Sequence, residues 1–217
     1  MAKRYCLLAL LSMMLVGTGN AQQIIYSTLK DVMRQKGDTL TTLRIEKRNR
    51  NQIMLMGGAD YKISVEGNHG LSRYLKSRCY AVQNDSLWYV NTRKVRYKRF
   101  RFGGWYAPAI WVKGNLYFCA QPVGSIAAEG EAPLNATRLG GEVGTAIASS
   151  GLVNSRVYYE IDTETGKVEF VDHQKMLLLL SDRPALRRAF RAEKSDSGEV
   201  IGRYLLQLQT KETRQGE

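Results

Sequence analysis

Short apolar segments separated by glycine-rich and asparagine-rich turns recur along most of this chain, and they limit what it can fold into. Residues 95–121 are aromatic and β-prone, with turns predicted at Gly103-Gly104 and at Lys113-Gly114-Asn115. Residues 156–161 and 167–171 flank the turn-forming sequence DTETG. Two β-prone segments around such a turn predict a β-hairpin. Further strands are predicted at residues 39–46, 52–56, 61–65, 79–83 and 87–90.

Helix signals lie between and after these strands. Thr28 with Asp31 predicts a capping box for a short helix, and Asn68 is placed to cap a second one. Pro184 suits a first helical turn, and Asp196 with Glu199 predicts another capping box. A loop is expected from residue 122 to 135, followed by a helix at 137–150. The order predicts an α+β fold: a mostly antiparallel sheet with helices between strands and a C-terminal helical segment.

The first 21 residues have the pattern of a secretory signal peptide. Two basic residues precede an apolar run at residues 6–16, and small residues at Gly19 and Ala21 precede Gln22. The apolar run is too short to be a membrane anchor, which needs about 20 residues. We therefore expect an exported protein, periplasmic or secreted, with a single domain at residues 22–217 and no transmembrane segment after cleavage.

The length of this domain limits its core, and its charge limits its expected partners. Removing 21 of 217 residues leaves 196, a length that buries a core without needing disulfides. The formal charge falls from +12 to +10 when Lys3 and Arg4 are removed. Such a charge bears on partners and solubility and not on the fold. Outside the cytoplasm the expected anionic partners are lipid head groups, acidic polysaccharides and acidic proteins, and no nucleic acid is expected.

Two cysteines remain after Cys6 leaves with the signal peptide. Cys79 and Cys119 could form a disulfide in an exported chain. Each also lies in an apolar, strand-like segment, where a buried free thiol is common. The sequence leaves both states open.

The segment from Arg93 to Phe102 (RKVRYKRFRF) carries the strongest binding signal. In a strand, Lys94, Arg96 and Lys98 form a basic row opposite the apolar face, and the aromatic alternation changes phase near Lys98, which predicts a bulge or sharp bend. Interleaved basic and aromatic residues are typical of a surface that binds polyanions. Tyr97 and Trp105 are the candidate stacking or packing partners. The other interpretation, which the residues of this segment favour, is an exposed or edge strand whose charges discourage aggregation.

Catalytic signals are weak. His69 and His173 lack the spacing of a metal site, the cysteines do not form CxxC, and the serines lack GxSxG. No metal and no cofactor is expected. A hydrolase-like enzyme would need a pocket assembled from distant residues, near His69, His173 or Cys119. The sequence favours a protein that is not an enzyme.

Two short sequences match a glycosylation pattern. Asp38-Thr39-Leu40 and Asp85-Ser86-Leu87 have the Asp-Ser/Thr-apolar form of bacterial O-glycosylation sites. Thr39 and Ser86 are therefore predicted modification sites.

A set of longer segments spans nearly the whole domain and resembles one family. The segments are DYKI (60–63), YLK (74–76), CYAV (79–82), RYKR (96–99), FGGWYA (102–107), YFCAQP (117–122), GGEVG (140–144) and YYEID (158–162). Together they resemble an uncharacterised family of exported Bacteroides-type proteins, a domain of unknown function. The resemblance implies a bacterial envelope or secreted location and supplies no catalytic residues.

We therefore expect a binding or structural module of the cell envelope whose basic face meets an anionic partner. One alternative is the enzyme described above. Another is a subunit of a larger envelope assembly, with the apolar stretch from Tyr106 to Trp111 as its interface.

Overall fold

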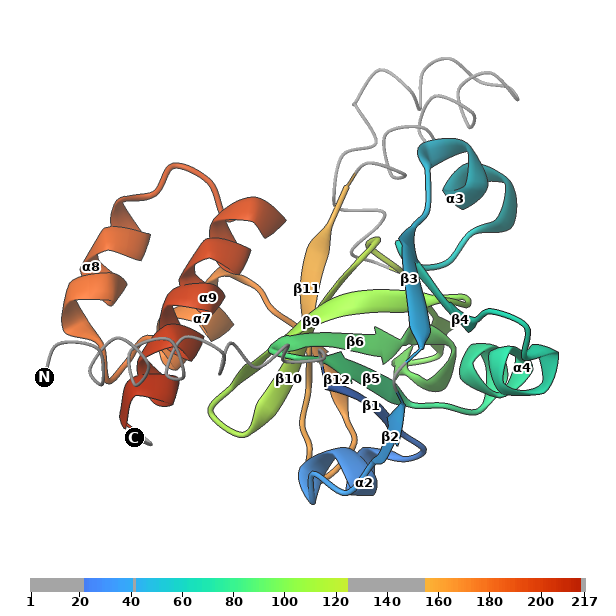
Figure 1. Cartoon of the computed structure of the whole chain (residues 1–217). Coiled ribbons are helices and arrows are strands. Elements are labelled where there is room, and N and C mark those ends of the chain that lie inside the picture. The colour runs from blue at the N-terminus through green and yellow to red at the C-terminus, as the bar shows by residue number, and fades with distance from the viewer. Residues whose placement is uncertain (1–21, 41, 125–154, 216–217) are drawn as a thin grey trace, which may run out of the picture.

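The computed structural model of the chain describes residues 22–40, 42–124 and 155–215 (Figure 1). Within these ranges ten strands form one sheet, and every pairing in it is antiparallel. The main strand order is β12-β11-β10-β9-β6-β5-β1-β2, while β3 pairs with β4 and β4 pairs with β9. The predicted α+β fold with a mostly antiparallel sheet is confirmed.

The strands of the sheet are short, and their turns lie where the sequence predicts them. β5 and β6 form a hairpin whose turn contains Asp85, and β11 and β12 form a hairpin whose turn contains Gly166. The strands are β1 (Gln23–Tyr26), β2 (Asp38–Leu40), β3 (Leu43–Lys47), β4 (Tyr61–Val65), β5 (Ala81–Asn84), β6 (Leu87–Asn91), β9 (Tyr106–Val112), β10 (Asn115–Ala120), β11 (Val157–Ile161) and β12 (Val168–Phe170). A separate two-stranded ribbon consists of β7 (Arg96–Tyr97) and β8 (Phe100–Arg101).

Helices cover different parts of this sheet. Figure 1 shows α7, α8 and α9 together at one side of the molecule, with α4 at the other. The helices are α2 (Leu29–Met33), α3 (Arg50–Met56), α4 (His69–Ser77), α7 (His173–Leu179), α8 (Pro184–Ala192) and α9 (Gly198–Gln215), with a 3-10 turn η1 (Thr92–Lys94) before β7. The helix predicted at residues 137–150 lies outside the described residues.

Side-chain caps begin most of these helices, whereas α8 begins with Pro184 and has no side-chain cap. Thr28 and Asp31 form the predicted capping box of α2, and the Asn68 side chain accepts the N–H of Leu71 at the start of α4. The cap predicted at Asp196 is wrong by one residue, because Ser197 precedes α9 and accepts the N–H of Val200 at 3.4 Å. Asp196 and Ser197 are both small polar residues whose side chains can accept an N–H of the first helical turn, so the sequence alone does not separate them.

Three apolar clusters bury the faces of the sheet. The first holds Tyr26, Trp88, Phe118 and Tyr159 on one face, and the second packs α7, α8 and α9 against β9 and β10. The third, around Leu75 of α4, lies under β1, β3 and β4. Burial of aromatic and aliphatic side chains from both faces is what holds the sheet between its helices.

One predicted strand and one predicted interface are wrong. Residues 52–56 belong to helix α3, because Asn49 and Gln52 form a capping box and only Ile53 of the helix is buried. The stretch from Tyr106 to Trp111 is not a surface for an assembly partner, because it lies in β9 between β6 and β10. Tyr106 is fully buried there.

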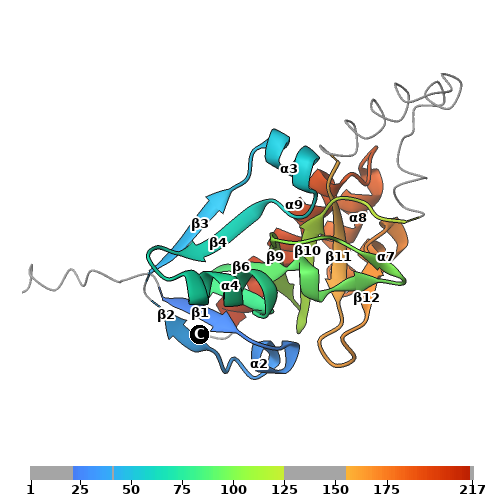
Figure 2. The ribbon, with the colours of Figure 1, turned by 90° about the vertical axis from the view of Figure 1, so that its right-hand side faces the viewer.

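Figure 2 shows where α3 lies. Strands β3 and β4 lead away from the rest of the sheet, and α3 joins them at their far end. This position places α3 at one extremity of the described part of the molecule.

Candidate basic surface and tryptophan pocket

The basic segment forms a tight hairpin. Tyr97 pairs with Phe100, so Lys98 and Arg99 are the two turn residues, and Lys98 has a φ of 54°. The sharp bend predicted at this point is confirmed. The left-handed region normally favours glycine or asparagine in such a turn, so a lysine there carries a conformational cost of about 1 kcal/mol.

The inner side of this hairpin belongs to the core. Val95, Tyr97 and Phe102 are all buried in the first apolar cluster. The ring of Tyr97 lies 5.4 Å from that of Tyr159, and the ring of Phe102 lies 4.7 Å from it. Because the turn reverses the chain, Tyr97 of β7 and Phe102, which follows β8, reach the same core. Tyr97 is thus a packing residue and not an exposed stacking platform.

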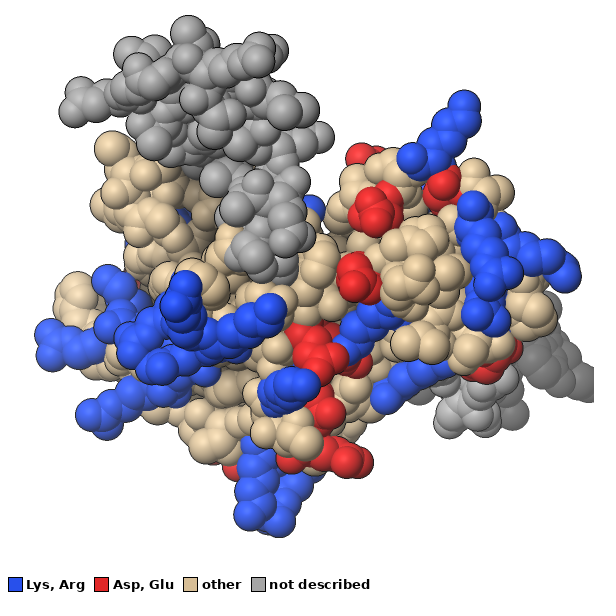
Figure 3. Space-filling view, turned by 180° about the vertical axis from the view of Figure 1, so that it is seen from behind, with Lys and Arg blue, Asp and Glu red and all other residues tan. Residues whose placement is uncertain are grey.

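The outer side of the hairpin is cationic. The predicted row of Lys94, Arg96 and Lys98 is exposed, and Arg93, Arg99 and Arg101 are exposed beside it. Within the described parts of the chain, no carboxylate forms an ion pair with any of the six. We call these six residues the basic hairpin surface. Figure 3 shows Lys and Arg side chains gathered on this side of the molecule, apart from a strip of Asp and Glu.

Trp105 lies at a turn that the 57–58 loop and the segment at Thr92 hold in place. Its φ is 76°, which is unfavourable for so large a residue. The buried Thr92 hydroxyl donates to the carbonyl groups of this turn, at 3.1 Å for both Gly104 and Trp105. A Cβ on Gly58 would lie 2.3 Å from the Gly104 carbonyl oxygen. Only glycine therefore permits the backbone of the 57–58 loop to contact the turn that presents Trp105.

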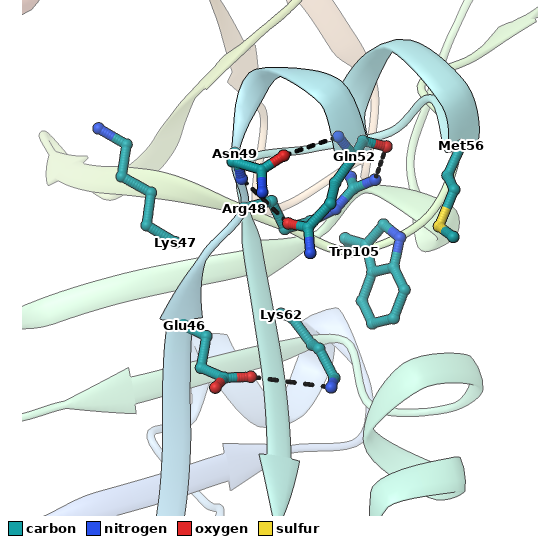
Figure 4. A pocket seen from close by; sticks show the side chains of 8 residues that line it. All are labelled: Glu46, Lys47, Arg48, Asn49, Gln52, Met56, Lys62 and Trp105. Carbon is teal, nitrogen blue, oxygen red and sulfur yellow. Dashed lines mark hydrogen bonds and ion pairs between the residues drawn. The ribbon is translucent and has the colours of Figure 1, made fainter.

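This turn places Trp105 in a pocket of about 390 Å³ between β3, β4 and α3. Figure 4 shows the indole beside Met56, with the Arg48 side chain above it. Four of the eight lining residues are charged, and three of those four are basic. The lining residues are Glu46, Lys47, Arg48, Asn49, Gln52, Met56, Lys62 and Trp105.

Arg48 places a buried positive charge behind the pocket. The residue is 6% exposed, and its guanidinium donates to the carbonyl groups of Gln52, Gly57 and Ala59 at 2.7–2.8 Å. Burial lowers the pKa of Arg48, and the Asp60 charge opposes that shift. The two Asp60 oxygens accept from Arg156 at 2.9 and 2.5 Å. Since that carboxylate is engaged by Arg156, the charge of Arg48 is only partly balanced.

Two cations contact the indole of Trp105. The Arg48 guanidinium lies 5.3 Å from the ring centre, and the Lys76 ammonium of α4 lies 5.0 Å from it. Cations at this distance are attracted to the negative face of an indole. Trp105 therefore connects the pocket to the basic side of α4. These partners come from distant parts of the chain and not from the predicted basic row, and a role of Trp105 in ligand binding stays a prediction.

The two cysteines are free thiols in the structure. Cys79 is fully buried, and its thiol donates to the Tyr26 and Ala81 carbonyl groups. Burial also raises the pKa of Cys119 to about 11, an effect that nearby Arg156 opposes. A thiol with a raised pKa has little thiolate at neutral pH and is a poor nucleophile. The hydrolase-like role considered from the sequence stays a prediction that this raised pKa does not favour.

The histidines are separated from this surface. His173 follows the Asp172 cap of α7, and its ring stacks on Phe190 at 4.8 Å. His69 is the first residue of α4 and is exposed. Neither lines the tryptophan pocket. In the described ranges, no group of three His, Cys, Asp or Glu side chains is placed to hold a metal ion.

The predicted modification sites lie on β2 and in the β5–β6 turn. Thr39 on β2 and Ser86 in the β5–β6 turn are exposed, and their modification stays a prediction. Arg48, Lys76 and α3 were not identified from the sequence. Their roles depend on contacts between segments far apart in the chain, and no local pattern marks them.

Comparisons with known proteins give one match. Neither the curated proteins nor the solved structures contain a match to this chain. Among the described helices, none has both the length and the apolar character needed to cross a bilayer. A family of unknown function, DUF6563, matches residues 24–212, and the chain therefore belongs to that family.

Proposed function

We propose that the protein is an exported, non-enzymatic binding module whose basic hairpin surface holds an anionic component of the cell envelope. Export rests on the N-terminal sequence pattern of basic residues, apolar run and small residues. The binding role rests on one observation: the segment from Arg93 to Phe102 turns Val95, Tyr97 and Phe102 into the core and its six cations outward.

The electrostatics favour a binding role over simple protection of a strand edge. Six of the nine residues from Arg93 to Arg101 are basic, and they repel one another when no anion is near. A strand edge is blunted by far fewer charges. A polyanion would relieve the repulsion and would gain about 1 kcal/mol for each cation near an anionic surface. The same contacts would weaken with salt, since the screening length is about 10 Å at 0.1 M.

The test is a charge reversal with a matched control. The variant Lys94→Glu/Arg96→Glu/Lys98→Glu removes the predicted row, and the control Arg188→Glu/Arg191→Glu/Lys194→Glu makes the same change in formal charge on and just after α8. The control helix packs in the second apolar cluster through Phe190, whereas the basic hairpin packs in the first. Retention of the purified protein is measured on vesicles containing phosphatidylglycerol and on immobilised polygalacturonate, at low and high salt.

Wild type is expected to bind at least one of these anionic probes at low salt and to be released at high salt. The hairpin variant is expected to bind at least about 100-fold more weakly, because three favourable contacts become repulsive. The control variant is expected to bind like wild type. Equal losses in both variants would show that binding depends on net charge and not on the basic hairpin surface, and would overturn the proposal. The absence of binding by wild type to either probe would also overturn it.

A further inference from the structure

The C-terminal part of α3 exposes three consecutive apolar side chains. Met54 is 53% exposed, Leu55 is 85% exposed and Met56 is 72% exposed. Only Ile53 of this helix is buried, so the other three do not serve the core. We call them the apolar tip. Exposed apolar residues that occur singly are ordinary, whereas a contiguous group at an extremity of the molecule marks an interaction site.

Cations surround the base of the apolar tip. Met56 lines the tryptophan pocket together with Lys47 and Lys62, and the neighbouring Gly58 shares a second cavity with Arg101 of the basic hairpin surface. Figure 3 shows Lys and Arg side chains gathered on one face of the molecule. The apolar tip and the basic hairpin surface are therefore parts of one continuous region.

A projecting apolar group beside a basic surface matches the two layers of a membrane interface. Apolar side chains gain free energy by entering the acyl boundary, while lysine and arginine remain at the head groups and bind anionic lipid. A polysaccharide would satisfy the cations but would leave Leu55 in water. A small ligand in the pocket would not cover Met54 or Leu55, which do not line it.

We infer that the anionic partner is the surface of a lipid bilayer, and that the protein binds it with the apolar tip inserted and the basic hairpin surface on the head groups. This inference rests on the proposed function and names its partner. Met54, Leu55 and Met56 enter the interface only to head-group depth, because α3 has only seven residues. The bound protein is thus peripheral.

The first test removes the apolar character of the tip and leaves its charge unchanged. The variant Met54→Gln/Leu55→Gln keeps good helix formers in α3, and the control Leu87→Gln/Leu178→Gln changes two exposed leucines on β6 and α7. Affinity is measured by co-sedimentation with vesicles that contain about 30% phosphatidylglycerol, the range in which basic residues add up to firm binding. The tip variant is expected to bind about 30-fold more weakly, and the control is expected to bind like wild type.

The second test observes insertion directly. Leu55→Cys is labelled with an environment-sensitive fluorophore, with Leu178→Cys as the control on α7. Labelling is selective because Cys79 is buried and burial raises the pKa of Cys119. On addition of vesicles, the emission of the probe at position 55 is expected to shift to the blue, while that of the probe at position 178 stays unchanged.

The outcomes separate this inference from the proposed function. Salt-sensitive vesicle binding with no shift at position 55 and no effect of the tip variant would overturn insertion and leave the basic surface as the binding site. Binding to polygalacturonate but not to vesicles would overturn the lipid assignment alone. If wild type bound neither probe, both proposals would fall. A blue shift at position 55 together with the loss in both the tip and the hairpin variants would support both.

Discussion

Glu169 shows how a single half-exposed side chain can respond to pH. Its two carboxylate oxygens accept from the ammonium groups of Lys167 and Lys175, each at 2.5 Å. These hydrogen bonds hold the pKa of Glu169 at about 2, well below the usual 4.5. Since the folded state binds this proton less tightly than the unfolded state, Glu169 stabilises the fold above pH 4.5, and that stabilisation is lost as the pH falls towards 2.

We therefore predict that the free energy of unfolding falls less steeply between pH 4.5 and 2 in Glu169→Gln than in wild type. The variant should have a lower urea midpoint than wild type at pH 6, and the difference should shrink steadily between pH 4.5 and 2. Urea unfolding followed by circular dichroism across this range measures it. Glu66→Gln, which changes an exposed carboxylate after β4, serves as the control, and an equal pH dependence in Glu169→Gln and wild type would contradict the assignment.

Helix α3 depends on local interactions at both of its ends. The capping box joins the Asn49 side chain to the Gln52 N–H at 2.9 Å, and Gly57 ends the helix with its N–H on the Ile53 carbonyl. Because only Ile53 is buried, little tertiary packing supports the helix. Such an element is expected to open locally without unfolding the sheet.

Replacing the cap should loosen α3 alone. Asn49→Ala is expected to cost about 1 kcal/mol locally, seen as faster hydrogen exchange at the amide of Gly57 with an unchanged global unfolding midpoint. Asn68→Ala is the matched change at the cap of α4, where Leu75 is fully buried. That variant should lower the global midpoint instead. An equal global loss in the two variants would show that α3 unfolds together with the domain.

The contrast between α3 and the hairpins shows what the sequence can predict. The β5–β6 and β11–β12 hairpins are marked by turn residues between β-prone segments, so local chemistry determines them. In α3 the same kind of apolar segment, Ile53 to Met56, looks like a strand, and only the Asn49–Gln52 cap identifies the helix. Hydrophobic periodicity cannot distinguish a helix from a strand in a segment of seven residues of which only one is buried.

The candidate site was predictable in part for a related reason. Residues 93–101 are contiguous, so their basic character and the bend at Lys98 can be read from the sequence. The pocket joins Arg48 to Trp105, and Lys76 reaches the same indole from α4. These contacts depend on how β3, β4 and α4 fold against the turn at Gly103-Gly104, which no short motif specifies.

At the scale of the whole molecule, the reactivity of the two thiols reports on whether the domain is folded. Cys79 and Cys119 lie in separate surroundings, and burial raises the pKa of both. We predict that alkylation at pH 8 modifies neither residue rapidly in the native protein and both after unfolding, as measured by peptide mass spectrometry. A disulfide, which the sequence left open, would instead leave both unmodified until a reductant is added.

The backbone contact between Gly58 and Gly104 also bears on how firmly the protein could hold a surface. It fixes the loop after the apolar tip against the turn after the basic hairpin, so the two attachment points keep a constant separation. Two weak contacts on a rigid spacer act like the two arms of a chelating ligand, because once one is engaged the other is already at a high local concentration. A flexible connection of the same composition would lose much of that advantage.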